Sequence, residues 1–167
     1  INVGANTPPT GQDALRTIVE DGSYTVLASD LGFGDADGHQ LAAVRIDTLP
    51  ASGQLLLNGV PVVAGQIVPA AAIAAGQLSM VPAANQNGAP YANFTFSVQD
   101  SAGAFDAAPN TFTLNVTPVN DAPVAQADVG STGEDATLTV TAGNGVIASA
   151  LAAGGRDSDV DGDGLAN

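Results

Sequence analysis

The sequence predicts an all-β protein built as a Greek-key β-sandwich, and three observations support this. Residues 93–100 and 111–117 alternate between apolar and polar side chains, as strands with one buried face do. Glycine and asparagine interrupt the apolar runs at short intervals, and Asn58-Gly59 has the composition of a tight hairpin turn. Only the alanine-rich run 70–75 favours a helix, of a single turn. About seven short strands with frequent turns are typical of a sandwich.

The predicted core is aliphatic, because aromatic residues make up only 4% of the chain. On the two alternating strands, the apolar residues all fall on one face. We expect these residues to point inward: Phe94, Phe96, Val98, Phe112, Leu114 and Val116. Further inward pairs are expected at Tyr24/Val26, Val44/Ile46, Leu55/Leu57 and Leu78/Met80.

An internal repeat indicates the domain organisation. When the chain is shifted by 114 residues, Asn6 falls on Asn120 and Glu20-Asp21 falls on Glu134-Asp135. A period above 100 residues indicates whole domains in tandem, the second copy being truncated, in an excerpt from a longer protein. The expected parts are the tail of a preceding repeat (1–5), a complete repeat (6–118), a proline-containing linker (119–124) and the N-terminal part of the next repeat (125–167).

Charge and composition exclude several classes of function. A net charge of −14, with three arginines and no lysine, argues against nucleic acid as a partner and favours divalent cations. No apolar run is long enough for direct membrane insertion. The chain has no cysteine, a single histidine and no Gly-x-Ser-x-Gly motif, so we expect no enzymatic activity.

Aspartates alternate in two loops that predict calcium sites. The loop nearer the C-terminus contains Asp157, Asp159, Asp161 and Asp163. Glycine follows the third of these aspartates, at the position where a calcium loop must bend sharply. No helices flank it, so we expect a calcium loop in a β-context rather than an EF-hand. Asp35 and Asp37 form the matching loop of the first repeat, where His39 replaces an acid and a plain turn is the alternative. His39 itself is expected to be a loop residue rather than a ligand.

The other acidic residues lie beside predicted strand ends or in the linker. They are Glu20, Asp21, Asp100 and, with a neighbouring amide, Asn120-Asp121. We expect them to gather at a domain boundary and to meet the acidic loop of the next repeat. Carboxylate and amide oxygens are the ligands that Ca²⁺ prefers.

These motifs together resemble a known family. Glu20-Asp21, the loop 35–38, the stretch 98–103 and the linker 119–123 look like the cadherin-like tandem repeats of bacterial RTX-type adhesins. The segment 145–163 is more similar to a VCBS repeat. The resemblance implies an immunoglobulin/cadherin-like fold in an extracellular protein of the bacterial cell surface or of a biofilm. It also implies a Ca²⁺-stiffened extender whose partners are the neighbouring repeats.

Residue roles follow from the same resemblance. Glu20, Asp100, Asn120 and Asp121 would be interdomain calcium ligands. The following domain would contribute Asp35/Asp37 or Asp157/Asp159/Asp161. Two alternatives use the same fold: a ligand-binding module that recognises a glycan or a surface, and a self-assembling fibre subunit that pairs its edge strands.

Overall fold

A computed structural model describes residues 5–121 and residue 134 of the chain. The chain divides into two compact units, Ile1–Pro118 and Val119–Asn167. Almost all described residues belong to the first unit, and the account below concerns that unit unless stated otherwise. None of the helices in the described part of the chain has the length and apolar character to cross a bilayer.

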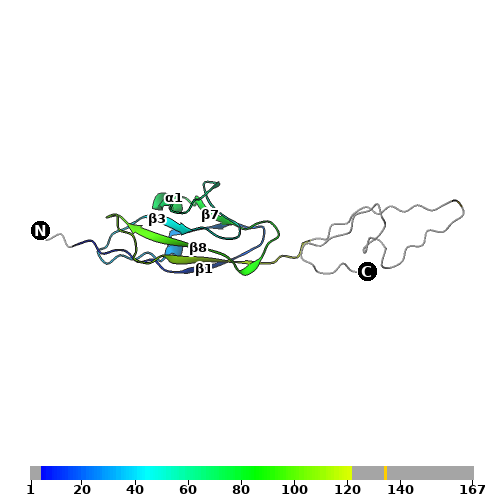
Figure 1. Ribbon diagram of the computed structural model, residues 1–167, viewed down its shortest axis with the longest axis horizontal. Coiled ribbons are helices and arrows are strands. Elements are labelled where there is room, and N and C mark those ends of the chain that lie inside the picture. Colours follow the sequence, from blue (N-terminus) through cyan, green and yellow to red (C-terminus); the bar gives the residue numbers. More distant parts are fainter. Residues whose placement is uncertain (1–4, 122–133, 135–167) are drawn as a thin grey trace. The chain divides into compact units, whose positions relative to one another are not determined.

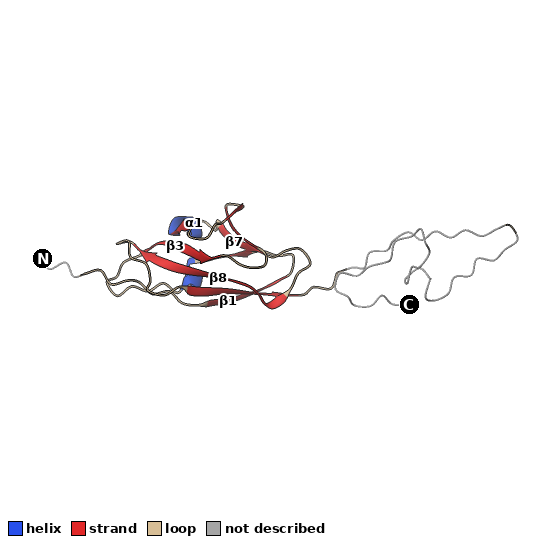
Figure 2. Cartoon of the chain, viewed as in Figure 1, coloured by secondary structure: helices blue, strands red, loops and turns tan. Residues whose placement is uncertain are grey.

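The first unit is a β-sandwich, as the sequence predicts (Figures 1 and 2). One sheet has five strands, in the order β1 (Ala14–Val19), β9 (Asn110–Thr117), β8 (Gly88–Asp100), β3 (Leu41–Thr48) and β6 (Ile67–Pro69). The other has four strands, in the order β2 (Tyr24–Thr25), β7 (Leu78–Val81), β4 (Gln54–Leu57) and β5 (Val60–Pro61). Neighbouring strands are antiparallel, except that β1 runs parallel to β9.

Two short helices complete the unit. The helix α1 (Ala70–Ala74) confirms the prediction of a single turn in the alanine-rich run. The 3₁₀ turn η1 (Ala28–Leu31) was not expected, because four residues are too few to show a helical period. It buries Leu31 in the core and also buries the carboxylate of Asp30.

The core lies between the two sheets and has the predicted composition. The inward faces of β8 and β9 are fully buried, and the rings of Phe94 and Phe112 stack with centroids 5.1 Å apart. The predicted hairpin is also present: Leu57 pairs with Val60 across Asn58 and Gly59, both of which have positive φ. Two successive positive φ values give a turn whose twist matches that of the flanking strands.

Strand β8 is a long strand that runs from one end of the unit to the other (Figure 1). It begins at Gly88, five residues earlier than predicted. The prediction missed the stretch 88–92 because it contains a proline and lacks alternation. Its first residue pairs with Val116, and its last, Asp100, pairs with Leu41. The irregular stretch 88–92 covers only two residues of β9, so at about 3.3 Å per residue the two ends of β8 are about 33 Å apart. We call the Asp100 end the N-terminal pole and the Gly88 end the C-terminal pole.

Candidate metal centre

The loop 35–39 at the N-terminal pole is folded around the side chain of Asp35. Its Oδ1 accepts hydrogen bonds from the backbone N–H groups of Asp37 (2.8 Å) and His39 (2.9 Å). Gly38 has φ 81°, a conformation that glycine adopts without steric cost, and this lets the chain turn tightly. The loop leads directly into β3 and is thereby held beside the end of β8.

The second oxygen of Asp35 is left without a partner. The side chain of Asp35 is only 1% exposed, and its Oδ2 is buried and accepts no hydrogen bond. Ligand atoms of Asp35, Asp37 and His39 all lie within 4.8 Å of one another. A buried carboxylate oxygen without a donor is unfavourable unless a proton or a cation neutralises it.

Asp100 lies at the same pole with its side chain fully buried. Its Oδ1 accepts the backbone N–H groups of Ala102 (2.9 Å) and Ala104 (2.8 Å). Burial alone would raise the pKa of Asp100, but the hydrogen bonds from Asn6 and from these backbone groups outweigh it and lower the pKa below its usual 3.8. Asp100 is therefore a carboxylate, and its negative charge stays in the site.

The segment that enters the domain from the N-terminal side closes the pole. Asn6 donates its Nδ2 hydrogen to Asp100 Oδ2 (2.9 Å), and the backbone N–H of Thr7 donates to Asp37 Oδ2 (2.6 Å). Thr10 and Gly34 exchange two backbone hydrogen bonds. Residues 6–10 are thus attached to the acidic loop and to the end of β8.

His39 points its Nδ1 into this cluster. The nitrogen is buried, has no hydrogen-bond partner, and lies 3.6 Å from Asp35 Oδ1 and 3.9 Å from Asp100 Oδ2. His39 lies in a loop, as the sequence predicts, and its ring nitrogen is close to two carboxylates. Its backbone N–H donates to Asp35 Oδ1, which holds residue 39 next to this carboxylate.

A second buried carboxylate, Asp30, has a very different environment. Arg16 donates to its Oδ1 from Nε (3.0 Å) and Nη2 (2.6 Å), while the hydroxyl of Tyr24 and the N–H of Leu27 donate to its Oδ2. The hydrogen bond to Asp30 is the main reason why the pKa of Arg16 is raised. Burial is the main cause of the raised pKa of Tyr24, and Asp30 adds to it.

A third acidic group lies on the outer face of the five-stranded sheet. Arg45 pairs with Asp47, which also accepts a hydrogen bond from Ser97, and the guanidinium stacks over the Phe105 ring at 4.7 Å. Asp106 accepts a hydrogen bond from Asn110 through Oδ2, whereas its Oδ1 is buried without a partner. Burial raises the pKa of Asp106 above its usual 3.8, although the hydrogen bond from Asn110 acts in the opposite direction.

The C-terminal pole holds Glu20 and Asp21 at the end of β1. Glu20 is buried and accepts a hydrogen bond from Asn87 (3.4 Å), and Asp21 Oδ1 accepts the backbone N–H of Asn85 (3.0 Å). These carboxylates are thus held by the connection between β7 and β8.

The structure corrects one grouping expected from the sequence. Glu20 and Asp100 do not gather at one boundary, because they lie at opposite ends of β8. Asp100 instead joins Asp35 and Asp37 of the same domain. The other predicted ligands lie elsewhere: Asn120 and Asp121 belong to the second unit, where Asn120 donates to the carbonyl of Asp121. The predicted loop with Asp157, Asp159, Asp161 and Asp163 lies outside the described residues.

Two residues of the N-terminal pole were not predicted as part of the site. Asn6 could have been found, because the internal repeat places it on Asn120, which was predicted as a ligand. His39 had no such signal, since the repeat places it on an aspartate and only the turn geometry directs its ring inward.

The residues of the N-terminal pole fit a hard divalent cation. Carboxylate oxygens come from Asp35 and Asp37, and Asp100 lies beside them with one oxygen bonded to the amide nitrogen of Asn6. Ca²⁺ takes 6–8 oxygen ligands at about 2.3–2.6 Å, and the exposed Asp37 side leaves room for water to supply the remainder. Among the described residues, the two arginines pair with Asp30 and Asp47, so neither neutralises this cluster.

A family model of the bacterial Ig domain matches residues 6–117. The chain belongs to the bacterial Ig domain family. The match covers the whole described sandwich and both of its poles. No curated protein and no solved structure is significantly similar to this bacterial Ig domain protein.

The family assignment supports a structural module of a surface or adhesin-type protein and a non-enzymatic role. Bacterial Ig domains are often extracellular or surface-exposed, which agrees with a role at the cell surface. It is coarser than the cadherin-like and VCBS resemblance of the sequence.

Proposed function

We propose that this bacterial Ig domain is a calcium-stabilised extender repeat of a bacterial cell-surface adhesin or biofilm protein, with Ca²⁺ bound at the N-terminal pole. The observation that carries the proposal is the side chain of Asp35, which is 1% exposed and has an unpartnered Oδ2 beside the ligand atoms of Asp37 and His39. The finer resemblance to cadherin-like and VCBS repeats of RTX-type adhesins belongs to this proposal.

Electrostatics favours a bound cation over an empty site. Two carboxylates about 4.8 Å apart repel by about 3 kcal/mol at an effective dielectric constant of about 20. Asp35, Asp37 and Asp100 bring three such groups to one pole, and no arginine in the described part of the chain pairs with them. A divalent cation converts this repulsion into ligation, so binding and folding of the pole are coupled.

The location of the site suggests how the cation would stiffen an array. Asn6 and Thr7 lie in the segment that enters the domain, and they bond to Asp100 and Asp37. A cation held by the same carboxylates fixes the direction of the entering chain. The repeat places Asn120 on Asn6, so we infer that the next junction is built in the same way, with neighbouring repeats as the partners.

Differential scanning calorimetry of the full chain tests the proposal. Stabilisation by a ligand at 100 times its Kd is about 2.7 kcal/mol, which corresponds to a rise of about 10 °C in Tm for a domain of this size. We expect this rise on adding CaCl₂ to chelated protein. The double variant Asp159→Asn/Asp161→Asn removes the second acidic loop and should retain the rise for the first unit. A Tm equal in CaCl₂ and in EDTA would contradict the proposal.

A second function, lateral self-association, is favoured by the distribution of charge. Residues 48–99 contain no charged side chain, although the chain has a net charge of −14. They supply three of the four strands of the smaller sheet, whose outer face is therefore uncharged. Its central cross-strand row consists of Thr25, Ser79, Leu56 and Pro61.

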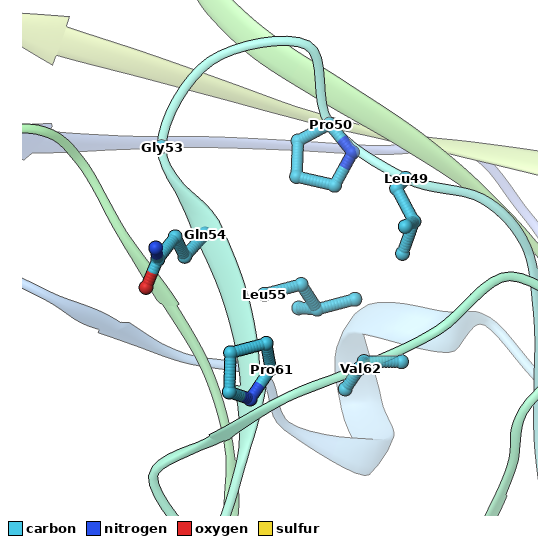
Figure 3. Close-up of a pocket in the computed structure, with 7 residues that line it drawn as sticks. All are labelled: Leu49, Pro50, Gly53, Gln54, Leu55, Pro61 and Val62. Atoms are coloured by element: carbon cyan, nitrogen blue, oxygen red, sulfur yellow. The ribbon is translucent and has the colours of Figure 1, made fainter.

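The edge of this sheet is also apolar. A groove of about 140 Å³ lies between Leu49 and Pro50 on one side and β5 on the other (Figure 3), and Val60 on β5 is 65% exposed. The groove is too small for a typical small-molecule ligand, which needs about 300 Å³ or more. The partner that fits is a second copy of this chain, because two uncharged faces can pack together without bringing carboxylates into contact.

Sedimentation velocity over a range of concentrations tests this second function. We expect association that Leu56→Glu abolishes, because the substitution sets two negative charges against each other across the contact. Thr113→Glu, on the outer face of the larger sheet, is the matched control and should leave association unchanged. A chain that stays monomeric at all concentrations would exclude self-association.

A further inference from the structure

The imidazole of His39 adds a nitrogen donor to a site that is otherwise built of oxygens. Its Nδ1 is buried without a hydrogen-bond partner and faces Asp35 and Asp100. The nearly fully buried Asp35 side chain, whose Oδ2 is also unpartnered, is a second and independent observation that points to a ligand site.

Neither protonation state of His39 satisfies the observed geometry by itself. A proton on Nδ1 would have its nearest carboxylate oxygens at 3.6 and 3.9 Å, too far for a hydrogen bond. Without that proton, the nitrogen lone pair faces two carboxylates and is repelled by them. An ion held between the nitrogen and the two carboxylates would bind the lone pair and neutralise the negative charges that face it.

The separations fit an ion of the first transition series. Ligands about 2.1 Å from one ion lie between about 3.0 and 4.2 Å apart for angles from 90° to 180°. The distances from His39 Nδ1 to Asp35 Oδ1 and Asp100 Oδ2 both fall in this range. Imidazole is a common ligand of zinc, copper, nickel and iron, whereas calcium takes oxygen.

We propose that the N-terminal pole also binds a zinc-class transition ion, with His39 Nδ1, Asp35 and Asp100 as ligands and Asp37 at the exposed side. The inference rests on the proposed function, since the carboxylates that would bind calcium are the same. Calcium and zinc would then compete for one position, and the ion present would determine whether His39 is a ligand.

Because His39 is the only histidine of the chain, its imidazole ¹⁵N resonances report on this site alone. We expect ZnCl₂, added to the chelated full chain, to move the Nδ1 resonance to the position of a metal-bound nitrogen, and CaCl₂ to leave it unbound. Excess CaCl₂ should reverse the effect of zinc. An Nδ1 resonance that zinc does not move would overturn the inference.

Isothermal titration of variants provides the second measurement. Loss of an outer partner of a metal ligand costs about 10–100-fold in affinity, so loss of the ligand itself in His39→Gln should weaken zinc binding by about 100-fold or more. Calcium affinity should stay within about threefold, because the glutamine side chain removes no oxygen ligand. Equal zinc affinities in the wild type and in His39→Gln would overturn the inference.

The outcomes separate the two proposals. If calcium raises Tm and zinc leaves His39 unmoved, the inference fails and the proposed function stands. If zinc binds through His39 and calcium has no effect on Tm, the calcium proposal fails and the transition-ion site stands.

Discussion

Asp30 and Asp35 are both buried aspartates, yet their surroundings differ in one respect. Asp30 is bonded to Arg16 and Tyr24, so its charge is neutralised within the fold. Asp35 has only backbone donors on one oxygen, and its other oxygen has no partner. In a chain with three arginines and seventeen acids, few carboxylates can pair with an internal cation. The N-terminal pole is where we expect a cation from solution to be required.

The largest predicted effect comes from Asp35→Asn. In CaCl₂ at about 100 times the Kd, the variant should lose the calcium-dependent stabilisation of about 2.7 kcal/mol. In the chelated protein it should instead be more stable than the wild type, because a buried negative charge is removed while Oδ1 still accepts both backbone hydrogen bonds. Urea unfolding with and without calcium measures both. A difference in stability between variant and wild type that has the same sign with and without calcium would show that Asp35 is not a ligand.

Asp30→Asn is the matched control, since it also removes a buried negative charge. It leaves Arg16 without its partner and should cost about 2 kcal/mol, a value reduced from that of a fully buried pair because Arg16 is 38% exposed. The loss should be equal in calcium and in EDTA. A loss that depends on calcium would mean that Asp30 and the pole are not independent.

A smaller effect is expected at Asp106, because the hydrogen bond from Asn110 offsets part of the cost of burying its charge. Its pKa in the folded state is raised above 3.8, so the folded protein binds this proton more readily than the unfolded chain does. The cost of the buried charge is present above the folded pKa and disappears as the pH falls through it. Arg45 and Asp47 are the charged groups nearby.

We therefore expect the stability of Asp106→Asn relative to the wild type to fall as the pH is lowered from 7 towards 3.8, since only the wild type gains from protonation. Urea midpoints of metal-free protein over this pH range measure the difference. A difference that does not change with pH would show that the pKa of Asp106 is the same in the folded and unfolded states.

The sandwich could be predicted from the sequence because its strongest signals are local. The alternation in β8 and β9 fixes the inward faces, and Asn58-Gly59 fixes a turn by backbone conformation alone. The 3₁₀ turn at Asp30 could not be found, because it is too short to show a period and its carboxylate is held by Arg16, 14 residues away.

The acidic residues of the N-terminal pole were singled out by the sequence, but their grouping was not predicted. The aspartates of the loop 35–38 and Asp100 stand out by residue type and by their position beside strands. That Asp100 meets Asp35 rather than Glu20 follows from the direction of β8 in the sheet, which the sequence does not state.

A crystal structure of the full chain grown with CaCl₂ tests the central claim most directly. We predict an ion at the N-terminal pole, about 2.3–2.6 Å from Asp35 Oδ2 and from an oxygen of Asp37. The Arg16–Asp30 pair should be unchanged. Calcium-saturated crystals in which Asp35 Oδ2 contacts only water or a protein donor would contradict the claim.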